Sequence, residues 1–165
     1  VGRADPATDP SGYRTLLTFQ LLERHYQVPG LARRLLAAAP ERNVRPREAD
    51  QIALVEAGEL DYVWTYENLA RAAKLRFLQL PADSDLGTVG DSAVYATAQL
   101  RVPGRGRGDS VTMRGEPIAY ALAVPKRAPH PALGARFVAF LGTADGRRVL
   151  RAQQLDALDS LVPVP

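Results

Sequence analysis

Residues 3–14 read Arg-Ala-Asp-Pro-Ala-Thr-Asp-Pro-Ser-Gly-Tyr-Arg, a turn-rich loop that runs directly into a helical pattern. Asp9 followed by Pro10 predicts the helix start, because an Asp side chain accepts from free first-turn amides and proline is preset to a helical φ. The apolar spacing predicts that this helix runs over 10–27 and ends before a Pro-Gly pair. On the local sequence Asp9 is predicted to be the N-cap, and the amides of such a helix start also bind anions.

The rest of the chain predicts an α/β fold, in which helices alternate with strands and pack on a mixed sheet. Further helices are expected at 31–39, 46–57, 67–74, 131–141 and 143–154. Strands are expected at 61–66, 75–80, 93–102 and 117–125, and the last is continuously apolar and so the most deeply buried. The third helix is expected to turn Ala49, Ile52, Ala53 and Val55 inward. The proline-rich residues 161–165 predict an irregular tail.

Composition places the chain among globular proteins and excludes several chemistries. Hydrophobic residues make up 46% and charged residues 24% of its 165 residues, so burial can offset the entropy of ordering. The absence of cysteine excludes disulfides, thiolate metal sites and a cysteine nucleophile. The net charge of +3 comes from arginines scattered among acids, unlike the one-sided basic face of a nucleic-acid binder. No apolar run approaches the roughly 20 residues of a transmembrane helix.

The histidines and the glycine-rich loop offer little for catalysis or cofactor binding. His25 and His130 lack the spacing of a metal-ligand pair. Gly104, Gly106 and Gly108 alternate with arginine and precede no helix, so they predict a mobile hairpin-like loop and not a phosphate cradle. We therefore expect no cofactor and no enzymatic activity.

The carboxylates Asp9 and Glu48 are a more informative pair. They lie 39 positions apart, yet each falls in the first turn of a predicted helix. Helix starts in an α/β lobe can converge on the same edge of the sheet. A first-turn acid favoured by the helix dipole also accounts for Glu48, so on these grounds both interpretations stay open.

Several blocks of sequence, taken in order, resemble the archaeal-type tungstate/molybdate-binding proteins. Besides residues 3–14 they are Val-Arg-Pro-Arg-Glu at 44–48, Leu-Val-Glu-Ala-Gly-Glu-Leu-Asp-Tyr at 54–62, Tyr66, Gly-Glu-Pro-Ile-Ala-Tyr at 115–120, Val-Pro-Lys at 124–126 and Phe-Val-Ala-Phe-Leu at 137–141. The resemblance implies a solute-binding protein of an ABC importer, with two α/β lobes of the type II fold closing on molybdate or tungstate. It also implies a periplasmic or cell-surface location, a lipid anchor in the full-length protein and the importer's permease as partner.

In that family two protein carboxylates coordinate the metal of the bound oxyanion, and the motifs place these on Asp9 and Glu48. Tyr66 falls on a site tyrosine, and the amides of Ser11 and Gly12 could donate to the oxo groups. Carboxylates repel sulfate or phosphate, whereas a hexavalent molybdenum or tungsten centre is a hard acid that suits further oxygen ligands. The family often has cysteine in place of Ser11, a change that should spare a backbone contact.

The resemblance also divides the chain. Residues 1–117 are expected to form the second, ligand-binding lobe, and residues 118–165 a hinge strand with C-terminal helices that return toward a first lobe, most of which is missing. By itself the chain is then expected to bind the oxyanion weakly or not at all. The alternative function is an oxyanion- or small-ligand-sensing domain of a cytoplasmic transcriptional regulator. An enzyme with Asp9 and Glu48 as an acid/base pair is disfavoured, because the sequence shows neither a titrating partner nor a substrate pocket.

Overall fold

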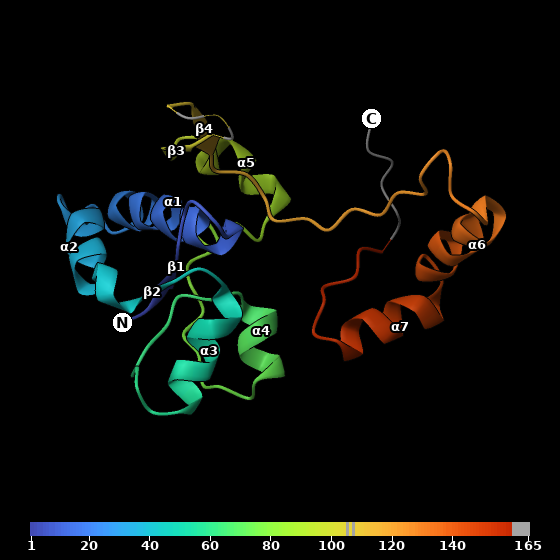
Figure 1. Ribbon diagram of the computed structural model, residues 1–165, viewed down its shortest axis with the longest axis horizontal. Coiled ribbons are helices and arrows are strands. Elements are labelled where there is room, and N and C mark those ends of the chain that lie inside the picture. The colour runs from blue at the N-terminus through green and yellow to red at the C-terminus, as the bar shows by residue number, and fades with distance from the viewer. Residues whose placement is uncertain (105, 107, 160–165) are drawn as a thin grey trace. The chain divides into compact units, whose positions relative to one another are not determined.

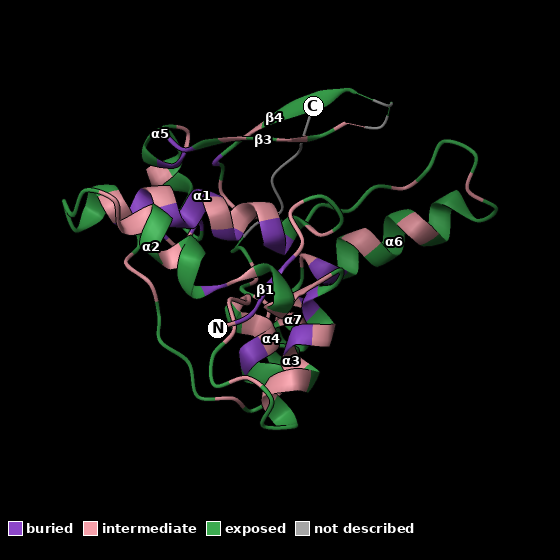
Figure 2. Ribbon diagram, turned by 60° about the vertical axis from the view of Figure 1, so that its left-hand side comes forward, coloured by how far each residue is buried: buried purple, intermediate pink, exposed green. Residues whose placement is uncertain are grey.

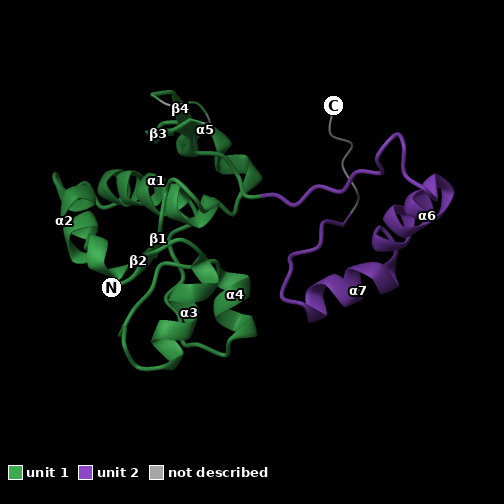
Figure 3. Cartoon of the chain, in the orientation of Figure 1, with its two compact units in different colours: residues 1–118 green, residues 119–165 purple. Residues whose placement is uncertain are grey.

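The computed structural model describes residues 1–104, 106 and 108–159 of the chain. It divides into two compact units, residues 1–118 and 119–165 (Figure 3). The assignment of residues 1–117 and 118–165 to parts of a larger two-lobed protein stays a prediction. Among the described residues, every helix is too short or too polar to cross a membrane.

The first unit opens with the loop and helix that its first residues predict (Figure 1). Helix α1, Pro10–His25, begins at the proline with its preset φ. Gly30 then takes a left-handed φ of +79° and leads the chain into helix α2, Leu31–Ala38, which packs on α1. Both predicted helices are confirmed to within two residues at each end.

A small parallel sheet lies between α1 and helix α3, Glu48–Glu56 (Figure 1). Strand β1, Arg3–Ala4, pairs with strand β2, Val44–Arg45, and α3 follows β2 almost at once. The buried amide nitrogen of Gln51 donates to the carbonyls of Arg3 and Asn43. This side chain therefore ties the first turns of α3 to the sheet and fixes where Glu48 lies.

The core of the unit lies on the inner face of α1, where buried residues gather (Figure 2). Leu17 and Leu21 of α1 pack with Leu86, Tyr95 and Ala98. The hydroxyl of the fully buried Tyr95 donates to the carbonyl of Ala82, so the segment before α5 is held against the core. The remaining elements of the unit are η1 (Glu41–Asn43), α4 (Glu67–Ala72), η2 (Val89–Asp91), α5 (Ser92–Tyr95), β3 (Gln99–Pro103) and β4 (Ser110–Arg114).

Three sequence predictions for the first unit are wrong in part or entirely. Residues 75–80 form no strand, and residues 61–66 contribute a single bridge, between Gly2 and Val63. An apolar run becomes a strand where a partner strand is present, and among the described residues 75–80 has none. Residues 93–102 begin as helix α5 and become a strand at Gln99, where β3 pairs antiparallel with β4.

The inward face of α3 agrees only in part with the one that its apolar residues predict. Ile52 and Val55 are half-buried, but Ala49 and Ala53 are exposed, whereas Glu48 and Gln51 are buried. The helix turns its polar residues toward the sheet because the carbonyls of β1 and of the turn before β2 lie there as hydrogen-bond acceptors.

The second unit consists of two predicted helices and their connections. Helix α6, Pro131–Leu141, and helix α7, Ala144–Ala152, are both confirmed, and the Thr143 hydroxyl caps α7 by accepting from the amide of Gly146 at 3.1 Å. Residues 117–125 are not a buried strand as predicted: they have no strand partner among the described residues and are mostly exposed. The predicted irregular tail, 161–165, lies outside the described residues.

Candidate functional site

Asp9 connects the starts of two helices. One carboxylate oxygen accepts from the amide of Ser11 at 2.8 Å and so caps α1, as the local sequence predicts. The other accepts from the amide of Glu48 at 2.9 Å, at the first residue of α3. The Asp9 carboxylate thus accepts from the first turns of two helices, whose dipoles both present their positive ends to it. The structure thus brings Asp9 and Glu48 together across 39 residues.

The side chain of Glu48 is buried but not isolated. One of its oxygens accepts from the Thr65 hydroxyl at 2.6 Å and from the amide of Tyr66 at 2.7 Å. Burial raises the pKa of Glu48 above its ordinary value, and the charge of Asp9 raises it further. The hydrogen bonds from Thr65 and Tyr66, with a contribution from the Ser11 hydroxyl, act in the opposite direction. The negative charges of Asp9 and Glu48 repel each other unless a cationic centre lies between them.

The Ser11 and Gly12 amides lie at the same place and are both engaged. Ser11 donates to the Asp9 carboxylate, and Gly12 donates to the Asp9 carbonyl at 3.0 Å. Gly12 also allows α1 to approach the loop closely, because a β-carbon there would lie 2.4 Å from the carbonyl carbon of Asp5. In this arrangement the two amides hold Asp9 in position.

Tyr66 lies at the start of α4 and is paired with Arg14 of α1. A guanidinium nitrogen of Arg14 donates to the Tyr66 hydroxyl at 2.7 Å, and the same guanidinium lies 5.7 Å from the ring centres of both Tyr13 and Tyr66. Burial acts to lower the pKa of Arg14, but the bond to Tyr66 and nearby charges outweigh it, so the pKa is raised overall. Both the Arg14 guanidinium and the Tyr66 hydroxyl, whose pKa burial raises, therefore keep their protons at neutral pH.

Arg14 is the site residue that the sequence reasoning missed. It closes the same motif that contains Asp9, and a basic residue five positions after the N-cap is the signal that could have found it. With Ser11, Thr65 and Tyr66 it contributes to the wall of a small hollow of about 60 Å³. The other described residues of that wall are Thr15, Thr18, Trp64, Leu80, Asp85, Leu86 and Ile118. The polar groups of this wall are therefore hydroxyls, one guanidinium and the carboxylate of Asp85, and they lie beside the pair Asp9 and Glu48.

The comparisons with known proteins bear on this site. A model of the family described as bacterial extracellular solute-binding protein matches residues 1–153. The chain belongs to this family. An uncharacterized solute-binding protein of Petrotoga mobilis is 38% identical over 149 residues, covering 90% of this chain and 46% of the relative.

Two further relatives carry names that specify a solute. The molybdate/tungstate-binding protein WtpA of Pyrococcus abyssi is 26% identical over 176 residues, covering 95% of this chain and 50% of the relative. A Haloferax volcanii protein named as a molybdenum-binding protein of an ABC transporter is 35% identical over 144 residues, covering 87% and 44%. The resemblance to tungstate/molybdate-binding proteins is confirmed. The chain spans about half the length of the curated relatives it matches.

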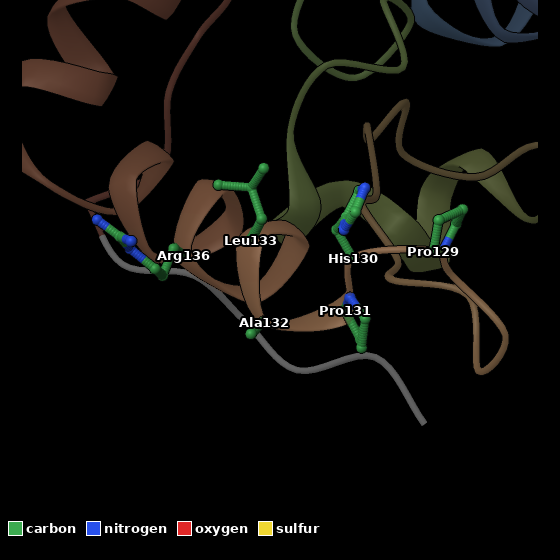
Figure 4. Close-up of a pocket in the computed structure, with 6 residues that line it drawn as sticks. All are labelled: Pro129, His130, Pro131, Ala132, Leu133 and Arg136. Atoms are coloured by element: carbon green, nitrogen blue, oxygen red, sulfur yellow. The ribbon is translucent and has the colours of Figure 1, made fainter.

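An open depression at the start of α6 is a second place where a solute could lie (Figure 4). It is lined by Pro129, His130, Pro131, Ala132, Leu133 and Arg136. None of the predicted site residues is among them, and its side chains are apolar apart from one imidazole and one guanidinium. Within the described part of the chain, no group of three or more His, Asp or Glu side chains could hold a resident metal ion. The surroundings of Asp9 and Glu48 remain the oxyanion site that the sequence predicts.

Proposed function

We propose that this protein binds molybdate or tungstate outside the cytoplasm and delivers it to the permease of an ABC importer. Asp9 and Glu48 each supply one oxygen to the metal centre of the oxyanion, and the Tyr66 hydroxyl donates to an oxo group. The membership in the extracellular solute-binding family and the names of two relatives support the solute class.

The observation that carries the proposal is the bond between the Asp9 carboxylate and the Glu48 amide at 2.9 Å. It holds the Asp9 carboxylate against the backbone of Glu48, and the charge of Asp9 acts on the Glu48 carboxylate, although 39 residues separate the two in the chain. A structural role alone explains Asp9, which caps α1, but it explains poorly why a second carboxylate is buried beside the first. Burying the Glu48 carboxylate next to the half-buried Asp9 is unfavourable without a cation, and a hexavalent metal centre that takes oxygen ligands relieves that repulsion.

The surroundings also suit the oxyanion's own negative charge. The N-termini of α1 and α3 converge on Asp9, so their dipoles offset part of the repulsion between the carboxylates and an arriving anion. Each Asp9 oxygen accepts one hydrogen bond and keeps a further lone pair for a metal. Coordination to the metal, and not attraction of charge, would then select molybdate and tungstate over sulfate and phosphate.

The proposal extends to the architecture of the whole protein. We propose a two-lobed protein in which residues 1–117 supply the carboxylate side of the site and another lobe supplies further hydroxyl and amide donors. A lipid anchor would hold the full-length protein at the outer face of the membrane, next to the permease. Under this proposal the 165-residue chain by itself binds more weakly than the full-length gene product.

Calorimetry combined with X-ray absorption tests this function. The full-length gene product should bind tungstate and molybdate and should not bind sulfate or phosphate at the same concentrations. The absorption spectrum of bound tungstate should give six oxygen neighbours around the metal, namely its own four and two from carboxylates. Equal affinity for sulfate, or four oxygen neighbours in the complex, would contradict coordination by Asp9 and Glu48.

A further inference from the structure

The pair Arg14 and Tyr66 joins the first turns of α1 to the start of α4, 52 residues further along the chain. We propose that Arg14 is a positioning residue for oxyanion binding, which orients the Tyr66 hydroxyl so that its proton points to an oxo group. This inference rests on the proposed function and adds a role that the two carboxylates do not have.

The direction of the hydrogen bond between Arg14 and Tyr66 supports this positioning role. A guanidinium has donors alone and no acceptor, so in the 2.7 Å contact the Tyr66 oxygen must accept. A phenol has a single proton, and this proton must then point away from Arg14. Among the described residues the Tyr66 hydroxyl makes no hydrogen bond as a donor, so its proton is available to a ligand.

The guanidinium is held in a fixed place. Its carbon lies 5.7 Å from the ring centres of Tyr13 and Tyr66, so aromatic rings flank the half-buried charge. Arg14 also lies on the first turns of α1, whose start is fixed by Asp9. A planar guanidinium close to two rings restricts the Tyr66 hydroxyl more than a flexible lysine would.

The hydroxyl lies close to the proposed metal ligands. The amide of Tyr66 donates to the Glu48 carboxylate at 2.7 Å, and the charges of Glu48 and Asp9 both act on the Tyr66 hydroxyl. An oxyanion whose metal contacts the carboxylates therefore brings an oxo group near this hydroxyl. Because the Tyr66 hydroxyl is neutral, it adds a hydrogen bond to the oxo group without attracting anions in general.

Arg14 acts through Tyr66, so the two residues should behave as one unit in a double-mutant cycle. Tungstate affinity is measured for the wild-type full-length gene product, Arg14→Gln, Tyr66→Phe and the double variant. Each single substitution should weaken binding by roughly 10- to 100-fold, the range expected for one hydrogen bond to a charged group. The double variant should bind about as weakly as Tyr66→Phe alone, because Arg14 has nothing left to orient.

Two further variants separate positioning from charge and from fold. Arg24→Gln removes another arginine of α1 that donates to a hydroxyl, that of Thr97, and should leave tungstate affinity unchanged. Arg14→Lys keeps a donor without an acceptor and should restore part of the affinity that Arg14→Gln loses. Circular dichroism of every variant shows whether the helices remain folded.

Ultraviolet resonance Raman spectroscopy gives a readout that a merely structural role would not change, because the tyrosine doublet reports whether a phenol donates or accepts. Wild type should show Tyr66 changing to a donor on adding tungstate, and folded Arg14→Gln should not. Additive effects in the cycle, or an Arg14→Gln variant with wild-type affinity, would overturn the positioning role while the proposed function stands. A wild-type protein that binds neither tungstate nor molybdate would overturn both.

Discussion

Helices α1 and α6 both begin with a proline in their first turn, and yet they differ in what their apolar residues do. In α1, Leu17, Phe19 and Leu21 are each no more than 2% exposed, whereas Leu133 and Phe137 of α6 are 62% and 56% exposed. Among the described residues of the second unit, only Leu141 and Gly146 are buried, so these residues enclose no core of their own. The first unit, which has a core, is therefore also the unit in which polar side chains are held in fixed positions.

The N-caps Asp9 of α1 and Thr143 of α7 show the same difference between the two units. Thr143 accepts from one amide three residues away, which is a purely local contact. Asp9 makes the same kind of local contact with Ser11 and also accepts from Glu48, in another helix. A cap can become part of a binding site where tertiary packing brings a second element to its free oxygen. The following predictions test this contrast between the two units.

The largest expected effect is on the stability of the first unit. Phe19→Ala should destabilise the protein by about 3–5 kcal/mol, because the buried ring packs edge-on against Trp64 with ring centres 4.8 Å apart. Phe137→Ala in α6 should change stability by less than about 0.5 kcal/mol, because the ring is exposed. Urea unfolding followed by circular dichroism measures both. Equal losses would mean that α6 is packed as tightly as α1.

The next effect is on ligand affinity. Glu48→Gln should weaken tungstate binding by more than the roughly 10- to 100-fold that loss of an outer-shell partner causes, because a metal ligand itself is removed. The fold should persist, since the glutamine oxygen can still accept from Thr65 and Tyr66.

Asp50→Asn is the matched control for this substitution. Asp50 lies in the first turn of the same helix and pairs with Arg47, away from Asp9. Calorimetry should find wild-type affinity for Asp50→Asn. If both variants lost affinity equally, the charge at the start of α3 would matter and coordination by Glu48 would not.

A smaller effect on the unfolding free energy distinguishes the N-caps Asp9 and Thr143. Asp9→Ala should cost about 2 kcal/mol of unfolding free energy, at the upper end of the range for N-caps, because the bond to the Glu48 amide is lost as well. Thr143→Ala should cost about 1 kcal/mol or less. Asp9→Ser keeps an oxygen for the Ser11 amide and lacks the second one, so its stability should fall between those of wild type and Asp9→Ala. Thermal unfolding that ranks Asp9→Ser with Asp9→Ala would show that the local cap contributes little.

The smallest effect is a pH dependence that resides in the first unit. Burial raises the pKa of Glu48 in the folded protein above the ordinary value of 4.5, so between the two values the folded state binds more protons than the unfolded state. The corresponding stability is fully present below the unfolded pKa and is lost as the pH rises through the folded pKa. The stability of wild type relative to Glu48→Gln should therefore decline over that interval. If the difference between the urea midpoints of wild type and Glu48→Gln did not change with pH, the pKa of Glu48 in the folded protein would lie at its ordinary value.

Most of the helices could be predicted from sequence to within a few residues, whereas the short helix α5 and most of the strands could not. The helix over 10–27 and the helix over 131–141 depend on prolines, caps and apolar spacing within the segment itself. The strands expected at 75–80 and 117–125 depend on a partner, and the described structure supplies none. Runs with strand-like composition therefore remain extended and largely exposed.

The sequence by itself determined where α1 begins and, to within two residues, where α3 begins, that Asp9 caps a helix, and that an acidic residue stands at the start of each. These features are local, since capping and dipole effects act within one helical turn. The tertiary structure alone decided that the Glu48 amide meets the free oxygen of Asp9, that Glu48 is buried, and that Arg14 meets Tyr66 across 52 residues. Such contacts follow from how β1, β2 and the buried Gln51 set the helices against one another, and local patterns in the sequence do not encode that packing.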